Sequence, residues 1–558
     1  MRRYISVAVT GAACMFQTVA GELPHLESPL PIPLVLSGNF GELRNNHFHS
    51  GLDFKTNGRI GYKVSSVADG YVSRIVVSPW GFGRAVYVTH PGLGLTTVYG
   101  HLDSFASKID ALAKAEQYGR EAFDLDMSFT PEQLPVTCGE TIGISGNAGS
   151  SGGPHLHMDV RDAATGDALD PMPYFRDRIA DNVAPQARQL ALYPTDRGLV
   201  GGSRHAAYRS PEQFATAFTA WGEVVPALKA YDRMTGTTNI YGVKYLTFNV
   251  DGRQMWRRTV DRVDLNRTRA INTLVNYPDK HRKGSWMMVT RVADANPLAQ
   301  MIEVENGNGV LVIDEERDYP CEFVMEDDHG NRSSVKFVVR GVRSDIPAVS
   351  HKGALFKHDK PSRTRGHGMD ATFPTGSFYD DFYFTSSMAP DTAFCSNVYT
   401  LGSPEVPLSG AYDVVIDLTV DTVADKRQYC VVQLDGGKKS ALATTYDRGR
   451  VTAHPNRLGR FAVTVDDVAP SVVPVGRAKW PVTGVVKYKI TDNLSGVKSY
   501  RGEIDGRFVL FELDGKTATA SFKLDPARVD KNGRAHRVVM TVTDGCGNET
   551  SVTDTFKW

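Results

Sequence analysis

Cysteine is scarce in this chain. Six cysteines occur among 558 residues, and none of them forms a C-x-x-C pair. The five that follow Cys14 are an odd number scattered along the chain, so they predict neither a disulfide framework nor a cysteine zinc site. Cys395 with Cys430 is the one pair that we consider for a bridge, and buried free thiols explain these residues equally well.

An excess of charge of either sign is also missing. The 63 basic and 63 acidic residues give a formal net charge of +0. No overall basic field attracts nucleic acid or an anionic membrane surface, so we expect no nucleic-acid partner.

Long apolar runs are absent as well. The segment Ile5 to Phe16 is too short for a spanning helix, which needs about 20 residues, and no later segment replaces it. We therefore expect no transmembrane segment.

Residues 1–20 have the pattern of a secretory signal peptide. Two arginines precede the apolar segment Ile5 to Phe16, and Thr18-Val19-Ala20 offers a small-residue cleavage site. We expect export to the periplasm or the cell envelope, with secretion beyond it as the alternative. A lipoprotein anchored through Cys14 is the weaker interpretation, because Gly11-Ala12-Ala13 lacks the large aliphatic residue expected three positions before a lipidated cysteine.

Alternation of apolar and polar residues predicts a mainly β protein. A chain of this length holds three to five domains of roughly 100–200 residues each. Near the N-terminus, four segments between Gly or Pro residues alternate in this way and predict a small antiparallel β domain: Lys63 to Val77, Arg84 to His90, Leu95 to His101 and His155 to Val160. One insertion, Ser104 to Ala122, has apolar residues at helical spacing and predicts a helix.

Histidines in this β domain form two short motifs. His49 and Asp53 have H-x-x-x-D spacing, and His155 and His157 form H-x-H in a predicted strand. Residues two apart in a strand point the same way, so these two imidazoles can share a site. His101 ends another alternating strand and can face the same groove. Imidazole and carboxylate are the ligands of catalytic zinc, which takes three protein ligands and a water, so the pattern predicts a metal hydrolase.

These motifs resemble those of the lysostaphin/LytM-type (M23) zinc metallopeptidases. The resemblance rests on His49-Ser50-Gly51-Leu52-Asp53, on Tyr99-Gly100-His101-Leu102 and on the segment from Gly146 to His157. It covers roughly residues 35 to 175.

The resemblance implies a fold, a cofactor and a reaction. It implies an antiparallel β catalytic domain with one Zn²⁺, for which His49, Asp53 and His157 are the ligands. His101 and His155 match the two histidines that assist catalysis without binding the metal. The implied substrate is the peptide part of peptidoglycan, cut in its stem peptides or cross-links. Met158-Asp159 departs from the family pattern, in which an aromatic and acidic pair is common at this place.

Other residues near the motifs receive structural interpretations. The glycine-rich loop before His155 lacks the Gly-Lys-Ser/Thr ending of a phosphate cradle, so we expect it to wall a substrate groove. His47 has the wrong parity to join Asp53 on one strand face, and His90 ends a strand before Pro91-Gly92; both are interpreted as structural or peripheral. Arg44 is interpreted as a solvated surface residue rather than a contact for a substrate carboxylate.

The chain after Pro171 predicts many short strands. Tyr231 to Gly236 has a counterpart in Thr491 to Gly496, and Glu326 to Asn331 has one in Thr543 to Asn548, so we expect two related Ig-like β-sandwich modules. The expected division is a signal peptide at 1–20, an M23-like domain at 21–178, a β-sandwich module with an insertion at 179–345, a β-rich middle domain at 346–466 and an Ig-like module at 467–558.

The repeated aspartates of the two modules admit two interpretations. Asp232 and Asp492, with Asn331 and Asn548, offer oxygen ligands that suit calcium. Aspartates that stabilise turns are more common, and this interpretation is preferred here.

Three functions remain open at the level of sequence. The preferred one is an exported zinc endopeptidase whose modules position it, bind wall or envelope partners, or restrain access to the groove. The second is an inactive LytM-like envelope protein that binds the cell wall or activates another hydrolase. The third is an adhesin with a structural zinc, which would not need His101 and His155. All five family positions are filled, which favours the enzyme.

Overall fold

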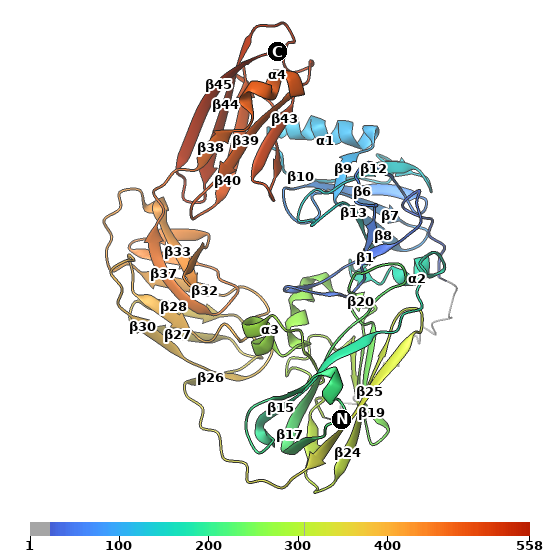
Figure 1. Cartoon of the computed structure of the whole chain (residues 1–558). Coiled ribbons are helices and arrows are strands. Elements are labelled where there is room, and N and C mark those ends of the chain that lie inside the picture. Colours follow the sequence, from blue (N-terminus) through green and yellow to red (C-terminus); the bar gives the residue numbers. More distant parts are fainter. Residues whose placement is uncertain (1–22, 306) are drawn as a thin grey trace, which may run out of the picture.

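The computed structural model describes residues 23–305 and 307–558, and in these ranges the chain is built mainly from antiparallel strands (Figure 1). The expected signal peptide at 1–20 lies outside the described residues. Among the residues described, no helix combines the length and the apolar character that crossing a membrane requires.

The N-terminal region contains the sheet that carries the histidines. Its main path runs β1-β4-β13-β8-β7-β6-β10, with bounds Leu36–Gly38, Leu52–Lys55, His155–Asp162, Leu95–Gly100, Arg84–His90, Gly70–Val77 and Leu125–Ser128. A smaller sheet holds β5 (Lys63–Ser65), β12 (Thr141–Ser145) and β9 (Leu102–Phe105). Alternate apolar residues of β6 and β7, such as Val72 and Val86, are fully buried, as the period of two predicts.

The predicted helix of this region is present. It is α1 (Ser107–Arg120), and its residues Ile109 and Ala113 are buried in the core of the N-terminal region. Glu121 ends it in the left-handed conformation. The sequence thus predicted both the strands around the motifs and the helical insertion.

The next region begins after the short helix α2 (Met172–Phe175) and forms one large sheet. The strand order is β16-β15-β17-β25-β24-β18-β19-β22, with bounds Ala207–Arg209, Gln186–Val200, Phe218–Tyr231, Arg332–Gly341, Asp318–Glu326, Tyr245–Val250, Arg253–Thr259 and Ile302–Val304. The expected insertion lies between β19 and β24 and includes α3 (Tyr277–Lys283). A strand of this insertion, β20 (Arg262–Val263), pairs with β14 (Ala168–Leu169) of the N-terminal region, and one hydrophobic core spans both regions.

The middle and last regions each contain two larger antiparallel sheets around a core of their own, and the middle region adds the antiparallel pair β26 (Ala354–Phe356) and β29 (Phe382–Phe384). The middle sheets are β27-β28-β32-β36-β35 (Ser362–Gly366, Met369–Phe373, Asp413–Asp417, Arg450–Ala453, Thr444–Asp447) and β30-β31-β37-β33-β34 (Ser386–Ala389, Val398–Leu401, Gly459–Val465, Tyr429–Asp435, Lys438–Ala441). The last sheets are β38-β39-β43-β42 (Ser471–Pro474, Val485–Thr491, Thr519–Lys523, Glu512–Asp514) and β41-β40-β44-β45 (Arg507–Phe508, Val497–Ile504, Ala535–Asp544, Glu549–Lys557), with α4 (Trp480–Thr483) beside them. The mainly β prediction is confirmed, whereas the Ig-like character of the modules stays a prediction.

The cysteines of the described regions are free thiols. Cys395 is partly buried and Cys430 is buried, and neither is bonded to another cysteine. Cys430 instead shares a small core with Cys546 of the last region. The structure therefore agrees with the thiol interpretation of the pair Cys395 and Cys430.

A buried ion cluster joins the N-terminal region to the next one. The Lys244 ammonium lies 2.5 Å from Asp170 Oδ2 and also binds Asp328. All three side chains are at most 10% exposed. Burial, followed by the charge of Asp328, raises the pKa of Asp170 to about 7. Burial alone would lower the pKa of Lys244, but the two carboxylates outweigh it and raise that pKa. One cation thus neutralises only part of the charge of two buried acids.

The last region folds back onto the N-terminal region, so that the chain forms a ring in Figure 1, with the last module beside α1. The rings of Tyr118 and Phe508 pack edge to face with centroids 5.9 Å apart. Arg84 Nη2 lies 2.7 Å from Glu512 Oε2, and Leu510 joins the hydrophobic core of the N-terminal region. The sequence gives no signal for this packing of the last region against the N-terminal region.

Candidate metal centre

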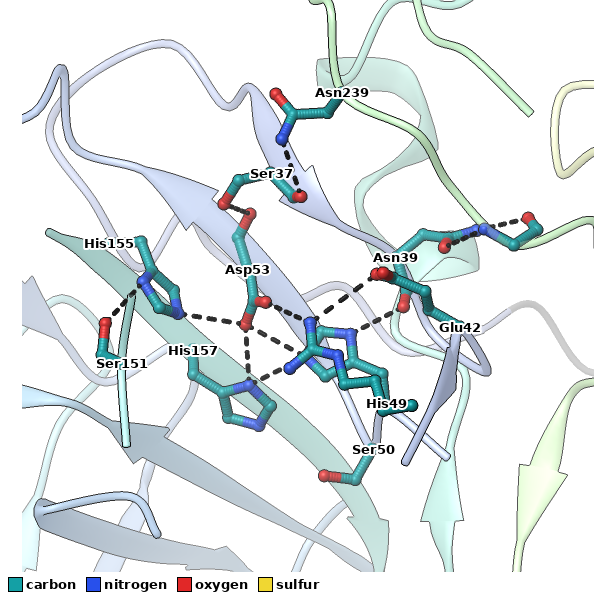
Figure 2. Close-up of polar contacts among 12 residues, drawn as sticks. Ser37, Asn39, Glu42, His49, Ser50, Asp53, Ser151, His155, His157 and Asn239 are labelled. Atoms are coloured by element: carbon teal, nitrogen blue, oxygen red, sulfur yellow. Dashed lines mark hydrogen bonds and ion pairs between the residues drawn. The ribbon is translucent and has the colours of Figure 1, made fainter. Parts of the chain in front are cut away.

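Three buried side chains converge at one point of the N-terminal sheet (Figure 2). His49 Nε2 lies 3.0 Å from Asp53 Oδ1 and 3.1 Å from His157 Nδ1, and His157 Nδ1 lies 2.8 Å from Asp53 Oδ1. Their exposed fractions are 2%, 5% and 2%. Two imidazole nitrogens and a carboxylate oxygen at such a point form a donor set that suits zinc.

Strand register produces this convergence. In the antiparallel pair β4 and β13, Asp53 lies opposite His157, and on the other side of β13 His157 lies opposite Gly100. His49 precedes β4 and reaches the same point from the loop that enters the strand. Two segments about a hundred residues apart in sequence thus become neighbours through a single register.

The outer nitrogens of both histidines are held by the protein. His49 Nδ1–H donates to the Asn39 carbonyl at 2.6 Å, and His157 Nε2–H donates to Asp159 Oδ1 at 2.6 Å. These bonds leave the lone pairs of His49 Nε2 and His157 Nδ1 directed at the centre. Such outer contacts fix the ring orientation and tautomer of metal-binding histidines.

Asp159 is a site residue whose role the sequence did not reveal. It is fully buried, accepts a 2.9 Å hydrogen bond from Ser50 Oγ and pairs with Arg161 at 2.6 Å. Burial alone raises its pKa, but His157 and then Arg161 outweigh burial and lower the pKa to about 2. A fixed negative charge behind His157 strengthens that ring as a ligand. The only signal in the sequence was the i, i+2 spacing of the two residues on one strand face.

His101 and His155 lie beside the three converging residues. Their ring centroids are 4.7 Å apart, and His155 Nε2 lies 3.3 Å from Asp53 Oδ1. His101 Nδ1–H donates to the Ala148 carbonyl at 2.8 Å, and His155 Nδ1–H donates to the Gly153 carbonyl at 2.8 Å. Both rings are therefore hydrogen-bonded to the glycine-rich loop through Nδ1, and their Nε2 atoms point away from the loop.

The backbone and the pKa of His101 are both unusual. His101 has φ +59°, a left-handed conformation that non-glycine residues seldom adopt and that concentrates at functional sites. Burial, followed by the neighbouring His157 and His155, lowers its pKa to about 3. The ring is therefore neutral at physiological pH.

Arg44 is a correction to the sequence interpretation. It is not a solvated surface residue: its side chain is 35% exposed, and its Nη2 donates to Asp53 Oδ2 at 2.7 Å. The hairpin of β2 (Leu43–Arg44) and β3 (His47–Phe48) brings it there. Gly38 makes room for this contact, because a Cβ at that position would lie 2.7 Å from Asp53 Oδ2 and 2.9 Å from Arg44 Nη2.

The two remaining histidines near the motifs are peripheral, as expected. His47 is exposed and contacts the Asn45 carbonyl. His90 is fully buried, where its ring nitrogens contact the Asp69 carbonyl and Thr97 Oγ1, both at 2.9 Å. Neither ring belongs to the group that converges on Asp53.

The glycine-rich loop forms one wall of the region around His101 and His155, and the last module supports it from outside. Lys516 Nζ donates to the Asn147 carbonyl and, at 3.3 Å, to the Ser151 carbonyl. A pocket between the loop and the last module is lined on the module side by Glu512, Leu513, Asp514, Lys516, Thr517 and Ser521.

Comparison with known proteins gives one sequence match and several structural ones. An uncharacterized metalloprotease of Haemophilus influenzae is 34% identical over 124 residues, which are 22% of this chain and 20% of that protein. Over these residues the chain is similar to that metalloprotease. It thus spans about a fifth of the length of the curated relative that it matches.

Solved structures of M23-type peptidases also match. The catalytic domain of the prophage-encoded M23 protein EnpA from Enterococcus faecalis is 23% identical, with 27% of this chain and 95% of that one covered and a TM-score of 0.20. The catalytic domain of lysostaphin from Staphylococcus simulans is 23% identical, with 25% and 89% covered and a TM-score of 0.18. TM-scores this low carry no argument about the family of this chain. Separately, the Zu5-like domain family matches residues 353–466, within the expected middle domain.

Substitution of Asp159 tests whether its carboxylate supports His157 at the metal centre. Replacing Asp159 by Asn removes the negative charge behind His157, and we expect zinc affinity to fall about 10–100-fold. Competition with a zinc indicator measures the change. Asp162→Asn is the matched control, because Asp162 lies on the same strand but binds Arg262 instead. Equal affinity in the two variants would remove Asp159 from the metal centre.

Proposed function

We propose that the protein is an exported zinc endopeptidase that hydrolyses peptide bonds in the stem peptides or cross-links of peptidoglycan. The observation that carries this proposal is the convergence of His49, Asp53 and His157 on one buried point, with two further histidines at its edge. Catalytic zinc sites typically use three protein ligands and leave the fourth position to water, whereas structural sites use four protein ligands.

In this proposal His49 Nε2, Asp53 Oδ1 and His157 Nδ1 hold one Zn²⁺. When bound there, zinc lowers the pKa of its water to about 7 and polarises the scissile carbonyl. The Asn39 carbonyl and Asp159 keep the two imidazoles in the ligand orientation. Arg44 holds the second oxygen of Asp53 and so fixes the carboxylate plane.

The two other histidines move protons in this proposal. His101 is neutral and gives its Nδ1–H to Ala148, so its Nε2 accepts the proton of the attacking water. His155 Nε2 lies 3.3 Å from Asp53 Oδ1, and once this ring has taken up a proton, its Nε2–H can stabilise the oxyanion or protonate the leaving amine. The glycine-rich loop orients both rings.

The substrate and the compartment follow from the same proposal. The substrate is a peptide of the cell wall, and the protein acts in the periplasm or cell envelope after export through residues 1–20. We also propose that the catalytic domain spans 21–178 and is followed by modules at 179–345, 346–466 and 467–558. The modules offer a surface for an envelope partner, and the contact of Lys516 with the glycine-rich loop supports a role of the last module in shaping the groove.

Digestion of purified peptidoglycan with the zinc-loaded full chain tests this function. Mass spectrometry of the soluble products is expected to reveal new amino termini, and a chelator followed by added zinc is expected to remove and restore them. A protein that binds zinc yet releases no new amino termini would be the inactive, wall-binding alternative instead.

A further inference from the structure

Three aspartates meet at the point where the chain enters the last module. Asp466, Asp492 and Asp544 each offer a carboxylate oxygen, and these oxygens lie within 4.8 Å of one another. Asp466 is 1% exposed and Asp544 is fully buried. This entry cluster is far in sequence from the metal centre and takes no part in the proposed reaction.

Part of the oxygen capacity of the entry cluster is used by backbone amides. Asp492 Oδ2 accepts hydrogen bonds from two N–H groups of its own loop, at 2.9 and 2.8 Å. Asp466 Oδ2 accepts one from Ser495 N at 2.9 Å. Asp544 is bonded to the amides of Cys546 and Asn548 through Oδ1 and to the Asn548 side chain through Oδ2. The contacts of Asp492 within its own loop are of the turn-stabilising kind that the sequence predicted.

The other oxygens have no such use. Asp466 Oδ1 and Asp492 Oδ1 are buried and have no hydrogen-bond partner among the described residues. The guanidinium of Arg427 passes near Gly547 but pairs with Asp425. A buried carboxylate oxygen without a partner is destabilising, and a cation bound at the entry cluster would supply the missing partner.

The same arrangement recurs in the region after α2. Asp181, Asp232 and Asp327 also bring carboxylate oxygens within 4.8 Å of one another, and Asp181 Oδ2 is buried without a partner among the described residues. Thr235 N donates to Asp181 Oδ1 at 3.1 Å, as Ser495 N donates to Asp466.

The third members of the two clusters correspond atom by atom. Asn331 N and Nδ2 bind the two oxygens of Asp327 at 2.9 and 2.8 Å, and Asn548 N and Nδ2 bind those of Asp544 at 2.8 and 2.8 Å. Each of these asparagines also donates to the backbone carbonyl of the first aspartate of its cluster. In both clusters the first aspartate, Asp181 or Asp466, keeps a buried oxygen without a partner among the described residues, which indicates a shared ligand.

We propose that each cluster binds one divalent cation of the calcium type, Asp181, Asp232 and Asp327 holding one and Asp466, Asp492 and Asp544 the other. Calcium takes six to eight oxygen ligands in flexible geometry, which carboxylates, backbone carbonyls and water supply. Metals that select nitrogen or sulfur would find only oxygen donors in the two triads. In this proposal some carboxylate oxygens stabilise turns by accepting backbone hydrogen bonds, and other oxygens of the same side chains bind the cation.

The position of the two clusters gives the cation a structural role. Asp181 and Asp466 precede β15 and β38, the first strands of their modules, whereas the other aspartates lie in loops or at a strand end within those modules. The cation therefore ties the entering chain to the module. At the second cluster, Gln428 of the middle region also donates to Asn548 Oδ1 at 2.8 Å, so this site lies at the junction of two regions.

Calcium titration of the zinc-loaded full chain tests the proposal. Calorimetry after removal of free divalent ions is expected to give two Ca²⁺ per chain, with Kd of about 10⁻⁴–10⁻³ M, as in extracellular modules. Asp492→Asn and Asp232→Asn are each expected to lose one of the two. Asp447→Asn, at an exposed acid of the middle region, is the control and keeps both. No binding up to about 10 mM, or the same two ions in both cluster variants, would overturn the proposal.

Thermal unfolding of the unmodified chain covers the case in which a variant does not fold. A ligand that binds only the native state raises Tm in a concentration-dependent way. We expect Ca²⁺ to raise Tm by several degrees relative to chelator, and Mg²⁺ to raise it much less. A Tm that does not respond to Ca²⁺, or responds equally to Mg²⁺, overturns a calcium-type site. Zinc content and peptidoglycan cleavage, measured separately, report on the proposed function and not on this one.

Discussion

His49→Ala is expected to remove zinc and peptidoglycan cleavage together. His49 supplies Nε2 to the centre, and its side chain is buried there. Asp53 and His157 alone are one ligand short of the three that catalytic zinc sites use. We expect metal content measured by mass spectrometry to fall below one tenth of the wild-type value, and released peptides to fall to the background of the chelated enzyme.

His101→Ala is the informative partner of this variant. The ring contacts the glycine-rich loop and not the three ligands through hydrogen bonds, so zinc content is expected to stay at the wild-type level. Loss of the proton acceptor is expected to lower kcat by about 10²–10⁴-fold. Zinc loss in His101→Ala, or cleavage at near wild-type rate in His49→Ala, would contradict the division of these residues into ligands and proton carriers.

Lys244→Met is expected to have the largest effect on stability. Lys244 is the cation that pairs with Asp170 and Asp328, and its removal leaves two buried carboxylates facing each other. Breaking a buried ion pair on one side destabilises by about 3–5 kcal/mol. Denaturant unfolding, followed through the first transition of this multi-region chain, measures the loss. Lys114→Met is the control, since its pair with Asp110 is largely exposed and is worth about 0–1 kcal/mol.

The effect of Lys244→Met depends on pH in a defined direction. The pKa of Asp170 in the folded state is raised to about 7, above about 3.9 in an unfolded chain. The folded state therefore holds this proton more tightly, and its contribution to stability declines as pH rises from about 4 to about 7. Without Lys244 the decline is steeper, so the destabilisation is expected to be smaller at pH 5 than at pH 8. A loss independent of pH would show that the two carboxylates are not the cause.

Local features of the sequence predicted much of the N-terminal region. Period-two alternation located β6, β7 and β8, and helical spacing located α1. Motif spacing and the family resemblance grouped His49, Asp53 and His157, and the structure brings their side chains to one point. These predictions succeeded where the deciding interactions lie within a strand, a helix or one strand pair.

Predictions failed where a side chain acts across the fold. Arg44 was misjudged because its contact with Asp53 depends on the β2 and β3 hairpin folding over the site. The sequence does not reveal the role of Asp159, because this role depends on the orientation of the His157 ring. The first aspartate of each acidic cluster, Asp181 or Asp466, is not indicated by the sequence because it precedes its module and lies outside the repeated motifs.

The support of the glycine-rich loop by Lys516 has a consequence for the order of events during biosynthesis. Asn147 and Lys516 are separated by 369 positions in the chain. At about 5–20 residues per second, a ribosome needs on the order of 20–70 seconds to add them. The residues of the proposed metal centre are thus complete long before the segment that contacts their neighbouring loop exists. A nascent or prematurely terminated chain would present the chemical groups of the centre without that contact.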